Sequence, residues 1–267
     1  MIAEGVHKTT GMAYTEAGDG PAVVLVHGWA CDRSFWRNQI EALSGVCRVL
    51  APDLRGHGAS SVPEDDYSLA RLAGDIHSVC HDLGAAPFVL VGHSMGGMVA
   101  QRYALDHPDD LAGLVLVATT AADPEKVLVS RQIASASPGE GFRSAFLRYS
   151  ASWFTPDSEP DLVLWVEDRM LRTPEHVAMK LVDAYADMDV REELSALDVP
   201  TLVIGALGDA STPVDRSVEL SQLIPGASLI TVDEVGHFVQ LERPEEVNEA
   251  LMAFLAGLGH LRGQTPN

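Results

Sequence analysis

Short runs of β-branched and aliphatic residues alternate along this chain with stretches of helical periodicity, and this alternation constrains the fold more than any other feature. It predicts the α/β class, a mainly parallel, twisted sheet with helices on both faces. A hairpin before Gly20 is expected to add antiparallel edge strands. The expected strands are Ala22–Val26, Cys47–Ala51, Phe88–Val91, Leu114–Ala118, Thr201–Gly205 and Ser228–Val232. The expected helices are Ser34–Leu43, Leu69–Leu83, Met95–His107, Pro213–Leu223 and Pro244–Leu258.

One region interrupts the alternation. Residues 123–196 contain no predicted strand, and several prolines divide this stretch into helix-sized pieces. We therefore expect an all-helical insertion at 123–196 within a core formed by residues 1–122 and 197–267. Most of its apolar side chains are expected to pack the insertion onto the core. Those at helical spacing are Phe142, Phe146, Tyr149 and Trp153, followed by Leu162, Trp165, Val166 and Met170.

The charge balance limits the partners. Acidic residues outnumber basic ones by 38 to 18, a formal net charge of −20, which repels nucleic acids and anionic membranes. The apolar runs fall short of the ~20 residues of a membrane helix. The N-terminus has no basic start followed by an apolar stretch, so we do not expect a secretory signal. Cys31, Cys47 and Cys80 lack the spacing of a disulfide framework. We expect a cytoplasmic protein.

The strongest chemical signal is Gly-His-Ser-Met-Gly at residues 92–96, between a predicted strand and a predicted helix. Glycines at 92 and 96 remove the Cβ atoms that would clash in a sharp strand-to-helix turn. Such a turn exposes the hydroxyl of Ser94 above the sheet, at a helix N-terminus. The pattern alone is weak, but in this strand–turn–helix context it indicates a nucleophilic serine.

A serine nucleophile needs a base, and the base needs a carboxylate that fixes its tautomer. Asp209 follows the strand predicted at 201–205, and His237 follows the last predicted strand. Both residues come at carboxyl ends of strands, the edge of the sheet where open α/β folds place their sites. The loop His27-Gly28-Trp29 follows the first core strand. Its Trp29 N–H and the Met95 N–H are candidate donors to an oxyanion.

The segments HGWACD, PDLRGHGAS, GHSMGGMVAQRYALDHPDDLAGLVLV, TLVIGALGD, VGHF and LERPEEV resemble the α/β-hydrolase fold superfamily over nearly the whole chain. The resemblance implies Ser94 as nucleophile, His237 as base, Asp209 as acid, and Trp29 with Met95 as the oxyanion hole. No metal or organic cofactor is implied. HGW with SMGG is similar to aryl esterases that have cofactor-free perhydrolase activity, whereas GHS and RGHGAS look more like general esterases and enol-lactonases.

The helical insertion matches the variable cap of that superfamily, which covers the site. By this resemblance, Trp153 and Trp165 of the insertion, together with Phe238, are expected to form walls of the substrate pocket. Trp29 is also a candidate for the pocket wall.

Several other residues compete for roles in the site. Asp123 holds a position from which some relatives supply the acid, but helix capping is its favoured role, so Asp209 is preferred. His93 is interpreted as a packed structural histidine. The resemblance places Arg55 and His57 on a scaffold loop near the edge of the site.

One helix face carries three side chains that can bind metals. His77, Cys80 and His81 share one helix face at i, i+3 and i+4, a spacing that can bind a metal, but no further ligand stands beside them in the sequence. We expect no metal there.

The expected function is a cofactor-free serine hydrolase that cleaves a small carboxylic ester or lactone through an acyl-enzyme intermediate. Haloalkane dehalogenases and epoxide hydrolases of the superfamily carry an aspartate where this chain has Ser94, so both are excluded. Three alternatives stay open: a perhydrolase or aryl esterase, a carbon–carbon bond hydrolase, and a slow-turnover ligand sensor with an intact triad.

Overall fold

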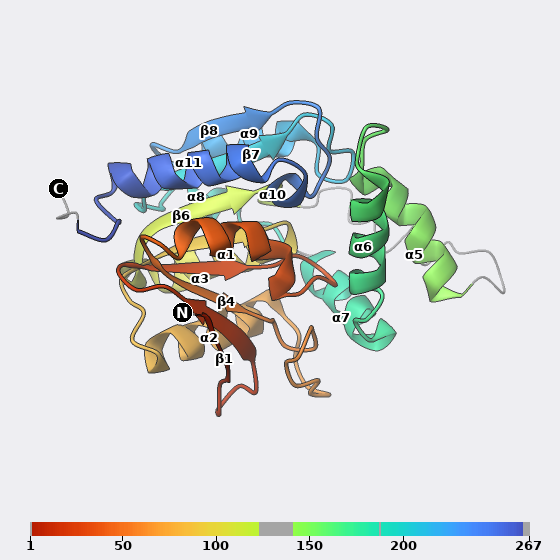
Figure 1. The fold of residues 1–267 in the computed structure, drawn as a ribbon, viewed down its shortest axis with the longest axis horizontal. Coiled ribbons are helices and arrows are strands. Elements are labelled where there is room, and N and C mark those ends of the chain that lie inside the picture. The colour runs from red at the N-terminus through yellow and green to blue at the C-terminus, as the bar shows by residue number, and fades with distance from the viewer. Residues whose placement is uncertain (1, 123–140, 187, 264–267) are drawn as a thin grey trace.

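The computed structural model describes residues 2–122, 141–186 and 188–263 (Figure 1). Its eight-stranded sheet has the order β1-β2-β4-β3-β5-β6-β7-β8. The N-terminal hairpin pairs antiparallel, β1 with β2 and β2 with β4, and the other neighbours pair parallel. The predicted fold class is therefore confirmed. The strands are β1 (Ile2–Val6), β2 (Ala13–Ala17), β3 (Ala22–Val26), β4 (Arg48–Pro52), β5 (Phe88–His93), β6 (Leu111–Val117), β7 (Thr201–Ala206) and β8 (Ser228–Val232).

Helices cover both faces of the sheet. The run Phe88–Val91 of strand β5 is apolar because both of its faces are buried. Leu90 belongs to the core on one face of the sheet, while Val89 and Val91 belong to the core on the other. The first face carries α2 (Leu69–Asp82), α3 (Met95–Asp106) and α9 (Val214–Leu223), and the second carries α1 (Arg37–Leu43) and α11 (Pro244–Gly257). The predicted helix Ser34–Leu43 is divided into a 3₁₀ turn, η1 (Arg33–Trp36), and α1. The short elements η2 (Pro108–Asp110), α8 (Arg191–Leu194) and α10 (Val239–Glu242) complete the core.

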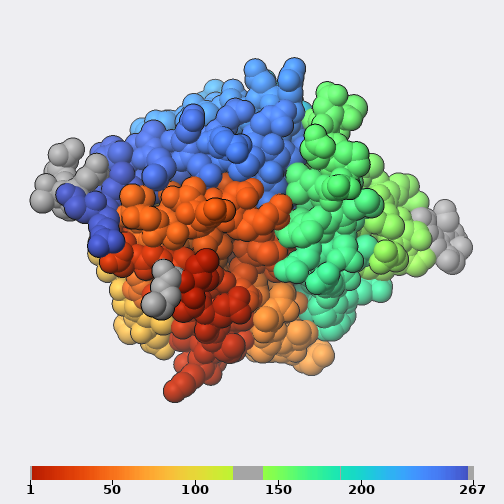
Figure 2. All heavy atoms as spheres, in the orientation of Figure 1, coloured from red at the N-terminus to blue at the C-terminus, as the bar shows by residue number. Residues whose placement is uncertain are grey.

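The described part of the helical insertion lies beyond the ends toward which the parallel strands run (Figure 1). It comprises α5 (Phe142–Ser150), η3 (Ala151–Trp153), α6 (Pro160–Met170) and α7 (Glu175–Ala186). Figure 2 shows residues 141–186 lying against the α1 and C-terminal regions of the core. Helix α8 falls inside the predicted insertion but contacts α3 and α9 of the core. The domain boundaries after 122 and before 197 stay a prediction.

Two further findings concern the described residues. Among the described helices, none is both long and apolar enough to cross a membrane. All three cysteines are free and buried, so no disulfide contributes to the stability of the described fold.

Candidate active site

Ser94 lies in the sharp turn between β5 and α3. Its backbone has a positive φ of 52°, a conformation that a non-glycine residue adopts only under constraint. A Cβ on Gly92 would come within 2.3 Å of the Gly96 carbonyl oxygen, and one on Gly96 within 2.4 Å of the His27 carbonyl oxygen. The two glycines therefore allow the strand, the turn and the preceding loop to approach closely enough to expose the Ser94 hydroxyl.

A chain of hydrogen bonds connects Ser94 to a buried carboxylate. The Ser94 Oγ lies 2.9 Å from His237 Nε2, and His237 Nδ1 lies 2.7 Å from Asp209 Oδ2. The Asp209 Oδ1 accepts two backbone N–H bonds of 2.8 Å, from Ser211 and Thr212. Because an ionised carboxylate only accepts, Nδ1 carries the proton and Nε2 is left to accept from the serine. The structure thus brings together Ser94, His237 and Asp209, which are far apart in sequence.

Two backbone N–H groups border the same cavity as Ser94. They belong to Trp29, in the loop after β3, and to Met95, the first residue of α3. Neither N–H donates to another residue in the described part of the chain, although both residues are buried. A buried N–H without a partner costs free energy, so such groups are typically kept where a ligand oxygen accepts from them. The arrangement can stabilise a negatively charged oxygen on an atom bonded to Ser94 Oγ.

A pair of buried histidines supports the Trp29 loop. His57 Nε2 accepts from the Ala30 N–H at 3.2 Å, and its Nδ1 donates to the Arg55 carbonyl at 2.9 Å. His27 Nε2 accepts from the Leu54 N–H at 2.9 Å. Burial lowers the pKa of His27 to about 4 and that of His57 to about 3. Both rings are therefore neutral at pH 7 and act as fixed backbone-binding groups.

His93 directly precedes Ser94, but its ring bonds to the backbone of His237. Its Nε2 donates to the His237 carbonyl at 2.9 Å, and its Nδ1 is buried without a hydrogen-bond partner. Burial lowers the pKa of His93 well below the ordinary value, and the neighbouring His237 lowers it further. His93 thus fixes the loop that carries His237, in keeping with its interpretation as a structural residue.

A cavity of about 160 Å³ opens at Ser94 and His237. An engineered apolar cavity of about this size accommodates a benzene molecule, so a short acyl group fits here. Trp153 and Phe238 are among the lining residues, as expected from the resemblance. The other side chains of the lining include Trp29, Cys31, His93, Met95, Met98, Thr120, Ala122, Tyr149, Met170, Tyr185, Ser211, Thr212, Pro213 and Arg216.

Trp165 does not line this cavity, which corrects the expectation that it forms a pocket wall. The centroid of the Trp165 ring lies 5.0 Å from that of the Phe35 ring. The guanidinium carbon of Arg37 lies 4.1 Å from the same Trp165 centroid. Helix α6 turns this side chain toward η1 and α1, so Trp165 joins the insertion to the core. The apolar stripe on α6 indicated burial correctly but did not distinguish core contact from pocket lining.

Two other candidate residues of the site, Asp123 and Arg55, were considered in the sequence analysis above. Asp123 lies outside the described residues. Arg55 is buried and bonds to Asp75 at 2.5 Å and to Asp65 at 2.7 Å, which is a scaffold role.

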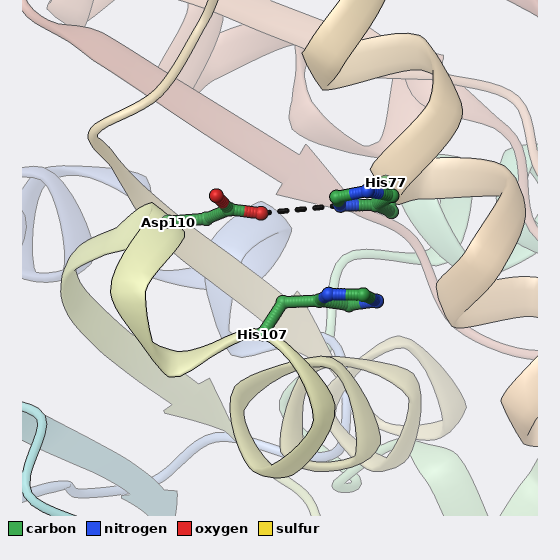
Figure 3. Close-up of side chains that lie close together, drawn as sticks. All are labelled: His77, His107 and Asp110. Atoms are coloured by element: carbon green, nitrogen blue, oxygen red, sulfur yellow. Dashed lines mark hydrogen bonds and ion pairs between the residues drawn. The ribbon is translucent and has the colours of Figure 1, made fainter.

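His77, Cys80 and His81 share a helix face whose spacing can bind a metal, but among the described residues their ligand atoms do not form a cluster. Cys80 is buried, which raises the pKa of its thiol, and His81 bonds to Asp82. His77 instead meets His107 and Asp110, and the ligand atoms of these three lie within 4.8 Å of one another (Figure 3). The two imidazoles stack with centroids 3.9 Å apart and planes 6° apart. Lone pairs in parallel stacked rings do not converge on one point, so the rings would have to rotate to bind a metal.

Sequence reasoning missed several polar residues in the cavity lining, among them Ser211 and Arg216. Ser211 Oγ lies 3.1 Å from the hydroxyl of Tyr149 on α5. Both residues follow Asp209 closely: Ser211 lies in the loop after it, and Arg216 lies in the first turn of α9. A signal was present, because residues just after a strand that supplies a site residue lie at the same edge of the sheet.

A mostly parallel sheet that holds a Ser–His–Asp hydrogen-bond chain at the carboxyl ends of its strands defines the class of α/β hydrolases. A family model described as alpha/beta hydrolase fold matches residues 21–244, so the chain belongs to this family.

Three similar proteins illustrate the range of the family. Non-heme chloroperoxidase CPO-A1 of Kitasatospora aureofaciens is 30% identical over 264 residues, which cover 91% of this chain and 94% of that protein. A thermophilic esterase from Thermogutta terrifontis has a TM-score of 0.86 at 29% identity, covering 96% of this chain and 98% of that one. The enol-lactonase from Burkholderia xenovorans LB400 has a TM-score of 0.86 at 28% identity, covering 95% and 100%.

Proposed function

We propose that this chain is a serine hydrolase of small carboxylic esters or lactones. The observation that carries the proposal is the hydrogen-bond chain Ser94–His237–Asp209 at the mouth of a cavity bordered by two free N–H groups. The names of two structural relatives, an esterase and an enol-lactonase, agree with it. The chemistry needs no cofactor, because the nucleophile, the base and the oxyanion donors all belong to the chain.

In the first half-reaction, Ser94 Oγ bonds to the carbonyl carbon of the substrate while its proton passes to His237 Nε2. The carbonyl oxygen becomes an oxyanion and accepts from the N–H groups of Trp29 and Met95. Asp209 stabilises the imidazolium that has formed. The carbon–oxygen bond to the leaving alcohol then breaks, and the alcohol takes the proton from His237.

The second half-reaction repeats these steps with water. Water attacks the acyl-enzyme carbonyl and gives one proton to His237, and Ser94 recovers that proton as the ester bond to its Oγ breaks. The products are the carboxylic acid and the starting enzyme. A lactone follows the same course, with its alcohol and acid joined in one molecule.

The test is a panel of p-nitrophenyl esters of increasing acyl length together with a set of small lactones. The proposal predicts a preferred short substrate with a kcat in the usual enzymatic range of ~1–10³ per second. Turnover below one per minute on every compound would contradict it and favour a ligand sensor that keeps the same three residues.

A second candidate function is supported by the chloroperoxidase name of a relative. If hydrogen peroxide takes the place of water in the second half-reaction, the acyl-enzyme yields a peracid. The same panel run with added peroxide distinguishes the two. Peracid formation faster than hydrolysis, measured by its oxidation of bromide, favours the perhydrolase; unchanged acid release favours the hydrolase.

A further inference from the structure

Arg216 lies in the wall of the cavity that contains Ser94. It occupies the first turn of α9, a helix that begins directly after the loop carrying Asp209. Among the described residues that line this cavity, there is no aspartate, glutamate, lysine or second arginine. In a chain with a formal net charge of −20, one arginine among described lining residues that are otherwise without a charged Asp, Glu or Lys side chain is a specific feature of the pocket.

The donors of Arg216 are largely unused. Its nearest ionic neighbour is Glu219, at 3.6 Å, which is longer than a hydrogen bond. Glu219 also lies 3.8 Å from Arg191. Within residues 2–122, 141–186 and 188–263, no hydrogen bond from the Arg216 side chain to another residue is formed. The guanidinium, which presents five N–H donors in a planar fork, is therefore free to bind a partner that enters the cavity.

We propose that Arg216 forms a carboxylate-binding subsite, and that the natural substrate is a small ester or lactone carrying a second, free carboxylate. This inference rests on the proposed function, since it names the substrate class of the same site. A guanidinium binds a carboxylate through two parallel hydrogen bonds, a geometry that fixes the orientation of the rest of the molecule. The acidic surface repels anions at long range, so preference for an anionic substrate depends on this local cation.

Two matched substrate pairs test the subsite. Monomethyl adipate is compared with methyl hexanoate, which places the carboxylate in the acyl part. The acetate ester of 6-hydroxyhexanoate is compared with hexyl acetate, which places it in the alcohol part. The measured quantity is the ratio of kcat/KM for the anionic ester to that for the neutral ester, at pH 7.5 and constant ionic strength.

In the wild-type protein we expect this ratio to exceed ten for one of the two pairs. Arg216→Gln should lower the ratio about 10- to 100-fold, the usual size of a lost charged hydrogen bond. Arg216→Lys, which keeps the charge but not the fork, should give an intermediate value. Arg191→Gln is the matched control, because Arg191 approaches the same Glu219 but does not line the cavity, and its ratio should equal that of the wild type.

Three results would overturn the subsite. A wild-type ratio near or below one for both pairs overturns it without any variant. This measurement therefore tests the subsite even if a substitution impairs folding. An Arg216→Gln variant whose ratio equals that of the wild type also overturns the subsite. So does an Arg191→Gln variant whose ratio falls as far as that of Arg216→Gln. In each of these cases hydrolysis of the neutral esters leaves the proposed function standing. If neither member of either pair is hydrolysed, the proposed function itself has failed.

Discussion

Four histidines lie close to Ser94, and their partners separate their roles. His237 accepts from the serine hydroxyl and reaches a carboxylate with its other nitrogen. His93 and His57 bond to backbone groups, as does His27. One histidine is therefore placed to exchange a proton with Ser94, and the other three hold the loops around it in position.

The supporting histidines make stability depend on pH. The pKa of His57 is about 3 in the folded protein against 6.5 for a free histidine, so below pH 6.5 the unfolded chain binds a proton that the fold does not. Protonation of the unfolded state lowers the free energy of unfolding as the pH falls, by up to ~1.4 kcal/mol per pH unit for each such residue. His27 acts in the same direction between pH 6.5 and about 4. The stabilising contribution is fully present above pH 6.5.

His57→Gln tests this dependence, since the glutamine oxygen can still accept from the Ala30 N–H. The variant should be less stable at pH 7.5 but lose less stability between pH 6.5 and 4.5, measured by urea unfolding. His176→Gln is the control, because His176 is exposed on α7 and forms no ion pair among the described residues, and the pH slope of this variant should match that of the wild type. A His57→Gln slope as steep as that of the wild type would show that the buried ring does not titrate in this way.

Among the elements, η3 and α6 each carry a tryptophan with a different role. Trp153 lines the cavity and its carbonyl accepts the backbone N–H of His237 at 2.7 Å. Trp165 packs on Phe35 and Arg37, away from the cavity. The two side chains are therefore expected to respond differently to truncation.

Trp153→Ala should shift the preferred acyl chain toward longer substrates, because it enlarges the pocket while the backbone carbonyl remains. Trp165→Ala should leave the order of preference unchanged and lower the melting temperature, because packing against Phe35 and Arg37 is lost. The loss in free energy of unfolding should be smaller than the ~3–5 kcal/mol typical of a fully buried aromatic residue, since Trp165 is half-buried. The measurement is kcat/KM across the ester panel, together with thermal unfolding. An equal change of acyl-chain preference in both variants would show that Trp165 lines the substrate cavity as Trp153 does.

Comparison with the sequence shows which elements a local pattern can predict. The core strands were predicted well because a buried parallel strand is a short, continuous apolar run. Ser94 and Asp209 each follow such a strand, β5 and β7, so the same pattern points to them. His237 follows β8, which is largely exposed, and its prediction depends on its place after the last strand and on the Val-Gly-His-Phe segment. Trp165 was misplaced, because helical periodicity gives the buried face of a helix but not the element that this face meets. The bond from His57 to the Trp29 loop joins residues that only the folded chain brings together.

The molecule as a whole combines an acidic surface with one reactive edge. Two antiparallel strands extend the sheet at its β1 side, and helices cover both faces. The Trp29 loop, Ser94 and Asp209 follow the carboxyl ends of β3, β5 and β7, and the described helices of the insertion lie beyond these ends (Figure 1). Trp153 and Met170 of the insertion line the cavity that contains Ser94. The central claim is that this edge makes Ser94 a nucleophile.

The most direct measurement of that claim is covalent labelling by a fluorophosphonate, with the modified residue identified by mass spectrometry. The account predicts one label, on Ser94, and a loss of esterase activity approaching ~10⁶-fold in Ser94→Ala. Ser221→Ala is the matched control, because Ser221 lies on α9 outside the cavity, and it should be labelled at Ser94 like the wild type. Asp209→Asn should slow labelling strongly, whereas Asp123→Asn should not. A label on any other residue, or full activity in Ser94→Ala, would contradict the account.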